Sequence, residues 1–437
     1  MGGRFQPEGE RQGSRAGPAR TRRHALVLVA MLGVTVVAVV AGYLFQPDGQ
    51  RADAAPAAAP RATSPYTIFG VNDLGMHCYQ KDYRAFLILP PANTLKVQVF
   101  KRSAEDATLV TKGITVSFTI AHNTYSAGKT NFWKFAADYG FKVKPNVGIT
   151  GTKLSGKMHL SADKKYWVAE YIPVTPYEDD GTWDPLQRAI VTVKDAATGK
   201  VLATQKPIVL PVSDEMNCAL CHGASGSPRN ILRAHDTNEG TTLLTDLSAG
   251  TRHACSECHA DNVLGAPGKP GVLPLSQAMH AWHADKMDPA TTAGLDTPCY
   301  ACHPGAKTRC LRGAMAAVGL TCTDPRCHGT MQHVADTQAA GRQAWLQEPR
   351  CETCHGAKYG ESANTLYRNS YLRNGPEGMN GRIMCETCHN STHAEWPSMR
   401  SVDNQLPVNV QGLPTYIRRC TACHQAESGG IHGNTGG

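Results

Sequence analysis

The sequence has little charge and less apolar material than a soluble protein of its length usually carries. Charged residues make up 18% of the 437 residues and apolar residues 41%, against soluble averages of about 25% and 45–50%. The composition still excludes a chain that is disordered throughout. A purely hydrophobic core has less material than expected, so something else is expected to fill part of it.

No run of basic residues interleaved with aromatic residues is present. Of the formal net charge of +8, the first 24 residues carry +4, from six Arg against Glu8 and Glu10. A nucleic-acid-binding protein would be expected to concentrate basic residues on one domain. The sequence therefore predicts no nucleic-acid partner.

One segment lacks charge altogether. Ala25 to Phe45 is a run of 21 uncharged residues after Arg20, Arg22 and Arg23, which is long enough for one bilayer crossing by a transmembrane helix. Residues 1–24 are then a basic cytoplasmic tail, 25–45 an anchor or uncleaved signal, and 46–65 an Ala/Pro linker. Ala52-Asp53-Ala54 leaves open the alternative of export after cleavage.

Residues 66–213 alternate between apolar and polar positions. Leu95, Val97 and Val99 follow this pattern, as does the run 114–120, and the stretch 189–205 contains a turn with Gly199 and predicts a hairpin. The expected fold class is multidomain: the transmembrane helix, an antiparallel β-sandwich of immunoglobulin-like type, and a loop-rich domain with short helices over 214–437.

Fifteen of the 16 cysteines lie after residue 214, and twelve of them form six copies of Cys-x-x-Cys-His. The copies are Cys218/Cys221/His222, Cys255/Cys258/His259, Cys299/Cys302/His303, Cys351/Cys354/His355, Cys385/Cys388/His389 and Cys420/Cys423/His424. This spacing is typical of covalent haem attachment, in which two thiols bind the porphyrin edge and the histidine binds the iron. Zinc sites and disulfides are the alternatives, and neither requires a histidine after each second cysteine.

A seventh, widened copy places four residues between Cys322 and Cys327, followed by His328. A disulfide is the alternative for this pair. Cys78 and Cys310 have no assigned role, and a bridge between them is one use of two thiols in an oxidising compartment.

The segment after residue 214 resembles a multihaem c-type cytochrome of the bacterial respiratory and extracellular electron-transfer kind. The resemblance implies seven haem c groups, or six if Cys322 and Cys327 do not form a site. It also implies the bacterial inner membrane as location, with the N-terminus cytoplasmic and the bulk of the chain periplasmic, and redox proteins as electron donor and acceptor. The β-domain is not assigned to a family.

Seven further histidines in this segment match the number of motifs. They are candidates for the second axial position of each iron, where a second imidazole gives a low-spin haem. These distal candidates are His235, His253, His280, His283, His333, His393 and His432. His280 and His283 are three residues apart on an expected helix and share one face, so they could ligate two adjacent haems.

Seven haems in about 224 residues must lie close together, so we expect a carrier of single electrons with no catalytic residues. The alternative is a multihaem oxidoreductase that acts on a nitrogen or sulfur oxyanion at one open haem. A sensor whose β-domain binds the ligand is the third hypothesis. Uniformly low-spin haem would favour the carrier.

Overall fold

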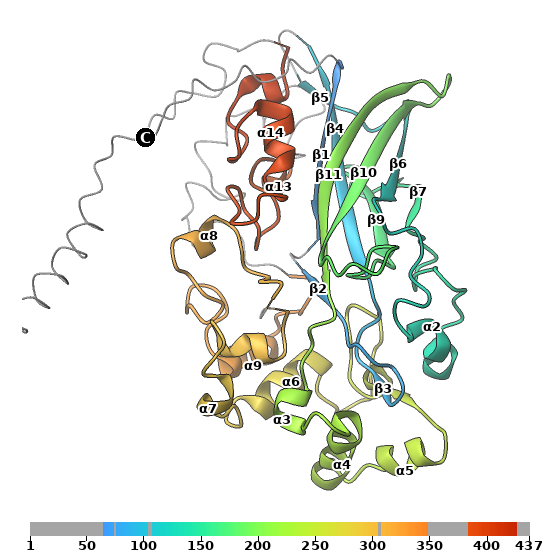
Figure 1. The fold of residues 1–437 in the computed structure, drawn as a ribbon, viewed down its shortest axis with the longest axis vertical. Helices are drawn as coiled ribbons and strands as arrows, with labels where there is room; N and C mark the ends of the chain where they lie inside the picture. The colour runs from blue at the N-terminus through green and yellow to red at the C-terminus, as the bar shows by residue number, and fades with distance from the viewer. Residues whose placement is uncertain (1–63, 74–75, 104–106, 305–306, 348–382, 426–437) are drawn as a thin grey trace, which may run out of the picture. The chain divides into compact units, whose positions relative to one another are not determined.

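The computed structural model describes residues 64–73, 76–103, 107–304, 307–347 and 383–425, all within one compact unit that spans residues 58–437 (Figure 1). Among these residues no helix is long and apolar enough to cross a membrane. The expected transmembrane segment, residues 25–45, lies outside the described part of the chain.

The first sheet has the strand order β1-β4-β9-β8, with β5 paired to β4. Its strands are β1 (Tyr66–Asn72), β4 (Asn93–Arg102), β5 (Ala107–Leu109), β8 (His159–Leu160) and β9 (Trp167–Ile172). All of its pairs are antiparallel, and β1 pairs with β4 from Tyr66 opposite Lys101 to Asn72 opposite Leu95.

The second sheet has the order β2-β11-β10-β6-β7. Its strands are β2 (His77–Cys78), β6 (Ile114–Ile120), β7 (Ser155–Lys157), β10 (Leu186–Asp195) and β11 (Val201–Ser213). The expected hairpin is confirmed as β10 and β11, joined through Gly199, whose φ of 71° suits the turn because glycine has no side chain to clash.

The two sheets share one apolar core. Val97 and Val99 of β4, Val116 of β6 and Val191 of β10 are all fully buried in the same cluster. The sheets approach closely at Gly70, where an added Cβ atom would lie 2.4 Å from Cδ1 of Ile208. Only glycine permits this approach of β1 to β11 without displacement of Ile208.

The helices are short, and most of them lie after Ser213. The helices of the described residues are α2 (Phe132–Phe135), η1 (Ala136–Tyr139), α3 (Ala219–His222), α4 (Ser227–Glu239), α5 (Leu243–Ser248), η2 (Cys255–Glu257), α6 (Leu275–His283), α7 (Pro289–Thr292), η3 (Pro298–Ala301), α8 (Ala314–Ala317), α9 (Met331–Ala339), α13 (Cys385–His389), α14 (Gln405–Gln411) and η5 (Cys420–Ala422). Helix α9 begins where the Thr330 side chain accepts a hydrogen bond from the His333 backbone, and α4 ends at left-handed Gly240.

The fold-class prediction is wrong, because the structure is built on mixed sheets with a few short helices. Strand β2 pairs with β11 in parallel, and β12 (His253–Ala254) pairs in parallel with β3 (Phe86–Leu87). The prediction missed these pairs because alternation marks a strand but not the direction of its partner. Strands of two residues are also too short to show alternation.

The cysteine-rich segment packs directly on the sheets. Thr387 of α13 donates a hydrogen bond of 2.6 Å to Oε1 of Gln98 in β4, and Ser391 donates one of 2.8 Å to Oδ1 of Asn72 in β1. Trp396 and Leu406 belong to the same apolar cluster as the sheets. The sheets therefore form a platform that positions α13 and α14, shown beside β1 and β4 in Figure 1.

Candidate functional site

Each described motif folds into a single helical turn. The backbone N–H of the motif histidine donates to the carbonyl of the first cysteine, at 3.0 Å in His222 and His259, 2.9 Å in His303 and 2.7 Å in His424. In the widened motif the corresponding bond, from His328 to Cys322, is 3.3 Å long. Two thiols and one imidazole are thus held on the same turn, as attachment to one porphyrin requires. Cys351, Cys354 and His355 lie outside the described residues.

Cys221 and Cys258, the second cysteines of the first two motifs, are predicted to bind haem, and the structure shows both as free thiols. Cys221 is exposed on α3, and Cys258 is half-buried directly after η2. Their backbone N–H groups donate to the carbonyls of Cys218 and Cys255, at 3.3 Å and 3.2 Å. Covalent attachment at Cys221 and Cys258 therefore stays a prediction.

Four motif histidines each face one of the distal candidates. The distances between ring centroids are 6.4 Å for His222 and His283, 6.3 Å for His235 and His259, 6.0 Å for His280 and His303, and 6.1 Å for His328 and His393. The partners come from different elements, since His235 lies on α4, His280 and His283 on α6, and His393 in the loop after α13.

These distances suit two imidazoles that share one metal ion. A metal–imidazole nitrogen bond is about 2.0 Å long, so two rings on opposite sides of an ion have centroids about 6.2 Å apart. Rotation about the metal–nitrogen bond leaves this distance unchanged, so interplanar angles from 21° to 87° are all compatible. Two neutral imidazoles in direct contact would have no reason to repeat this spacing four times. The residues therefore fit haem iron with two axial histidines.

Hydrogen bonds at Nδ1 orient these rings. The Nδ1 atoms of His280 and His283 lie 2.6 Å and 2.8 Å from the carbonyls of Ser276 and Met279, one turn earlier on α6. His259 Nδ1 lies 2.7 Å from the Leu273 carbonyl, and His235 Nδ1 lies 2.9 Å from the Thr241 hydroxyl. An Nδ1–H bound to a protein acceptor leaves the Nε2 lone pair for a metal ion.

Two of the motif histidines, His303 and His328, are held in the neutral form that ligates metals. Burial, together with the neighbouring rings of His280, His328 and His393, lowers the pKa of His303 to about 4. Burial and His393 lower the pKa of His328 to about 4 as well. Both imidazoles are therefore uncharged at neutral pH, as coordination requires.

Cysteines from different motifs lie close to one another. The thiols of Cys299 and Cys322 share a hydrogen bond, which lowers the pKa of Cys299 and raises that of Cys322. Burial, together with Cys218 and Cys221 of the first motif, raises the pKa of Cys302 to about 11. Protonated thiols such as those of Cys302 and Cys322 are poor nucleophilic catalysts. The first motif, the third motif and the widened motif are therefore neighbours in space.

The same proximity is found at the C-terminal end of the described residues. Burial, together with Cys388 of the preceding motif, raises the pKa of Cys423 to about 12. Burial alone raises the pKa of Cys388 to about 11. The motifs that begin at Cys385 and Cys420 are therefore neighbours in space.

The remaining predicted distal ligands are placed differently. His253 Nδ1 lies 2.8 Å from Glu257 Oε2 and its Nε2 lies 3.3 Å from Asp246 Oδ2, and the hydrogen bond to Glu257 raises the pKa of His253. His333 is exposed on the first turn of α9. Neither is the ring partner of His222, His259, His303 or His328, and His432 lies outside the described residues.

Cys78 and Cys310 are free thiols in the structure. Sγ of Cys310 lies 3.6 Å from Nδ1 of His393, which makes Cys310 the Nδ1 partner of that ring. Burial raises the pKa of Cys78 to about 12, and Cys310, Cys302 and Cys218 raise it further. Cys78 therefore lies among the motif cysteines although it belongs to the β-sheet segment.

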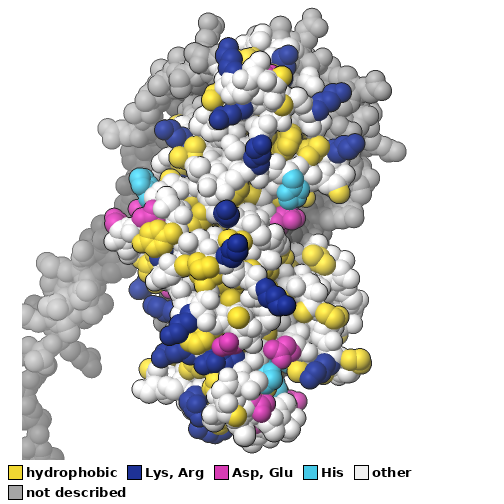
Figure 2. Space-filling view, turned by 90° about the vertical axis from the view of Figure 1, so that its right-hand side faces the viewer, with side chains coloured by type: hydrophobic (Ala, Val, Ile, Leu, Met, Phe, Trp, Pro, Cys, Tyr) yellow, Lys and Arg dark blue, Asp and Glu magenta, His cyan; other side chains and the backbone are white. Residues whose placement is uncertain are grey.

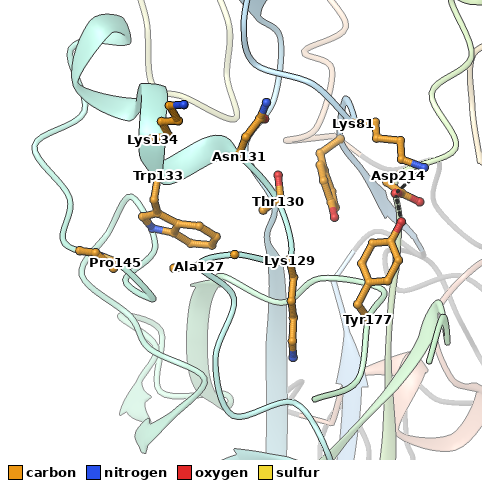
Figure 3. A pocket seen from close by; sticks show the side chains of 12 residues that line it. Lys81, Ala127, Lys129, Thr130, Asn131, Trp133, Lys134, Pro145, Tyr177 and Asp214 are labelled. Atoms are coloured by element: carbon orange, nitrogen blue, oxygen red, sulfur yellow. Dashed lines mark hydrogen bonds and ion pairs between the residues drawn. The ribbon is translucent and has the colours of Figure 1, made fainter. Parts of the chain in front are cut away.

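A separate pocket of about 620 Å³ lies against the sheets and includes no motif residue (Figure 3). Asp214 in its wall accepts a hydrogen bond of 2.7 Å from the Tyr177 hydroxyl and lies 4.0 Å from Nζ of Lys81. Lys129 is already paired with Asp179 at 2.7 Å. The pocket offers no group that the haem chemistry would use.

Comparison of the chain with protein-family models, with curated proteins and with solved structures gives no match. The argument about function therefore rests on the residues themselves. Sequence reasoning missed the Arg312–Asp403 ion pair that holds the segment carrying His393, and no local pattern signals it. The run Leu74-Gly75-Met76-His77-Cys78 marks a cluster at His77 in the sequence, but it does not show which residues surround that ring.

Proposed function

We propose that this protein is a multihaem c-type cytochrome that carries single electrons along closely spaced haems outside the cytoplasm. The observation that carries the proposal is the set of four histidine pairs at 6.0–6.4 Å, each joining a motif histidine to a second histidine. Bis-histidine ligation gives low-spin iron without an open position. This arrangement supports transfer of electrons rather than catalysis on a substrate.

In this proposal each motif binds one haem through two thioether bonds, and the paired histidines hold the iron from both sides. The haem iron supplies reversible uptake and release of one electron. The chain orients the imidazoles of His235, His259, His280 and His283 through hydrogen bonds at Nδ1. Because the same two histidines would ligate oxidised and reduced iron, the reorganisation energy of electron transfer would be small.

Contiguity of the sites follows from shared elements. Helix α6 carries His280 toward His303 and His283 toward His222, so the first and third motifs are joined by one helix. The Cys299–Cys322 hydrogen bond joins the third motif to the widened motif. We infer that electrons pass between neighbouring haems along these connections.

The charge distribution supports a docking role for the β-sheet segment. Residues 66–213 contain 18 Lys and Arg against 12 Asp and Glu, whereas residues 214–437 contain 18 against 20. Figure 2 shows Lys and Arg side chains spread over one face, with apolar side chains between them. Such a surface suits an acidic redox partner, and electrostatic attraction would speed the encounter. The uncharged run 25–45 directs this part of the chain across the cytoplasmic membrane.

The test is the intact mass of the full-length protein isolated from a host that attaches haem. We expect the mass of the polypeptide plus seven haems, and the variant Cys322→Ser with Cys327→Ser should carry one haem fewer. Cys310→Ser is the matched control, because Cys310 belongs to no motif, and it should retain every haem. A mass equal to that of the polypeptide would contradict the proposal, and an equal haem count in both variants would remove the seventh site.

The same kind of measurement tests the first two motifs one cysteine at a time. Cys221→Ser and Cys258→Ser each leave one thiol of their motif in place, so each variant should keep its haem by a single thioether bond or lose it. Cleavage of the protein and mass analysis of the peptides that contain Cys218 and Cys255 measure this directly. Wild-type peptides without added haem mass would remove these two sites.

A further inference from the structure

Among the histidines of the described β-sheet segment, His77 has the hydrogen-bonding pattern of the paired rings. His77 begins β2, and its Nε2 atom is buried without a hydrogen-bond partner among the described residues. Its other nitrogen binds the backbone of Pro90, which has only a carbonyl to offer. His77 is therefore the tautomer with hydrogen on Nδ1 and a lone pair on Nε2.

A buried lone pair without a partner indicates a group that the protein binds at this position. Leaving a polar atom buried and unsatisfied costs about 1–3 kcal/mol, so native structures retain such atoms where a ligand or water completes them. Burial also lowers the pKa of His77 to about 4, so the ring is neutral and able to ligate a metal at neutral pH.

Haem iron fits this position better than a free metal ion. Among the described residues, no three His, Cys, Asp or Glu side chains gather as a metal site. A free ion would therefore lack a set of three protein ligands at His77 among these residues. Haem iron obtains four ligands from the porphyrin and needs only axial groups from the protein.

The location of β2 is consistent with such a role. His77 pairs with Val212 and Cys78 with Ser213 at the end of β11, the strand that leads to the first motif. The adjacent thiol of Cys78 is influenced by Cys218, Cys302 and Cys310. The Trp345 ring lies 5.5 Å from the His77 ring and adds an aromatic surface to this environment.

We propose that Nε2 of His77 is an axial ligand of a haem iron other than the four irons that the histidine pairs account for. The inference rests on the proposed function and extends it, because it makes the β-sheet segment part of the redox centre. The bond formed is coordinate, from the Nε2 lone pair to iron, and involves no change of oxidation state.

The test compares the full-length holoprotein with His77→Ala and with the control His159→Ala, which removes an exposed histidine of β8. All three should carry the same number of haems by intact mass. We expect one high-spin ferric haem to appear by electron paramagnetic resonance in His77→Ala alone, and added imidazole should convert it back to low spin.

His77→Met serves as a second variant in case the alanine variant folds poorly. A thioether in place of the imidazole should keep that haem low-spin and raise its reduction potential, leaving the other haems unchanged in a redox titration. Unchanged spin state and potentials in folded His77 variants would overturn the inference and leave the proposed function intact, with a water molecule as the partner of Nε2. Absence of covalent haem from the wild-type protein would overturn both.

Discussion

The β-sheet segment and the cysteine-rich segment reach a stable structure by different means. Among the described residues, 38 of the 50 buried apolar side chains lie between residues 66 and 213, and only 12 lie after residue 213. The second segment is the longer one, yet its helices are short and its core is sparse. In the proposed holoprotein, haem groups would take the place of the apolar side chains that this core lacks. The thioether bonds to these haems would restrain the unfolded chain much as disulfides do.

The two segments also differ in how they bury polar groups. In the cysteine-rich segment, Arg312 is 1% exposed and Asp403 0%, joined by bonds of 2.7 Å and 3.0 Å. Buried polar residues of the sheets are mostly amides, such as Asn123, which bonds to Thr175 and Gln187 at 2.9 Å. A fully buried ion pair is needed where apolar packing cannot fix the loops.

Production of the full chain without haem attachment should have the largest effect. Helices α4 and α6 should lose protection from amide hydrogen exchange, because the distal histidines that they carry, His235, His280 and His283, would have no iron to join. Strands β10 and β11 should stay protected by their apolar core. Equal protection in both segments would show that haem contributes nothing to the fold.

Asp403→Asn should have the next largest effect. The substitution leaves the buried Arg312 guanidinium without its counter-charge, which costs about 3–5 kcal/mol. Denaturant unfolding of the holoprotein measures the loss. The matched control is Asp285→Asn, which removes an exposed ion pair with Lys286 and should change stability by less than about 1 kcal/mol. Equal losses of stability in the two variants would mean that burial does not increase the contribution of the Arg312–Asp403 ion pair to stability.

Leu95→Ala tests the apolar core of the sheets. Leu95 in β4 is 0% exposed, and its truncation should cost about 2–5 kcal/mol, at the lower end if the neighbouring side chains relax into the cavity. Leu346→Ala is the control, because Leu346 is 63% exposed and should contribute less than about 0.5 kcal/mol. The haem spectrum should be the same in both variants, since neither residue belongs to a motif. A spectral change in Leu95→Ala would show that the haem sites of the cysteine-rich segment depend on the apolar core of the sheets.

Local patterns predicted those elements whose signals lie within a few residues. The run 114–120 alternates and forms β6, and the stretch around Gly199 forms the β10–β11 hairpin. His280 and His283 were expected on one helix, and both lie on α6, each facing a different motif. The parallel pairs of β2 and β3 were missed because nothing in a two-residue strand identifies a partner far away along the chain.

The sequence by itself determined the Cys-x-x-Cys-His motifs, since two thiols and an imidazole at fixed spacing are a local property of one helical turn. Which second histidine faces each motif was decided only by the tertiary structure. His393 follows His389 by four residues yet faces His328, and Cys78 lies more than 130 residues before the first motif yet interacts with Cys218 of that motif. These contacts join residues that are distant in sequence, and only packing of the whole chain brings them together.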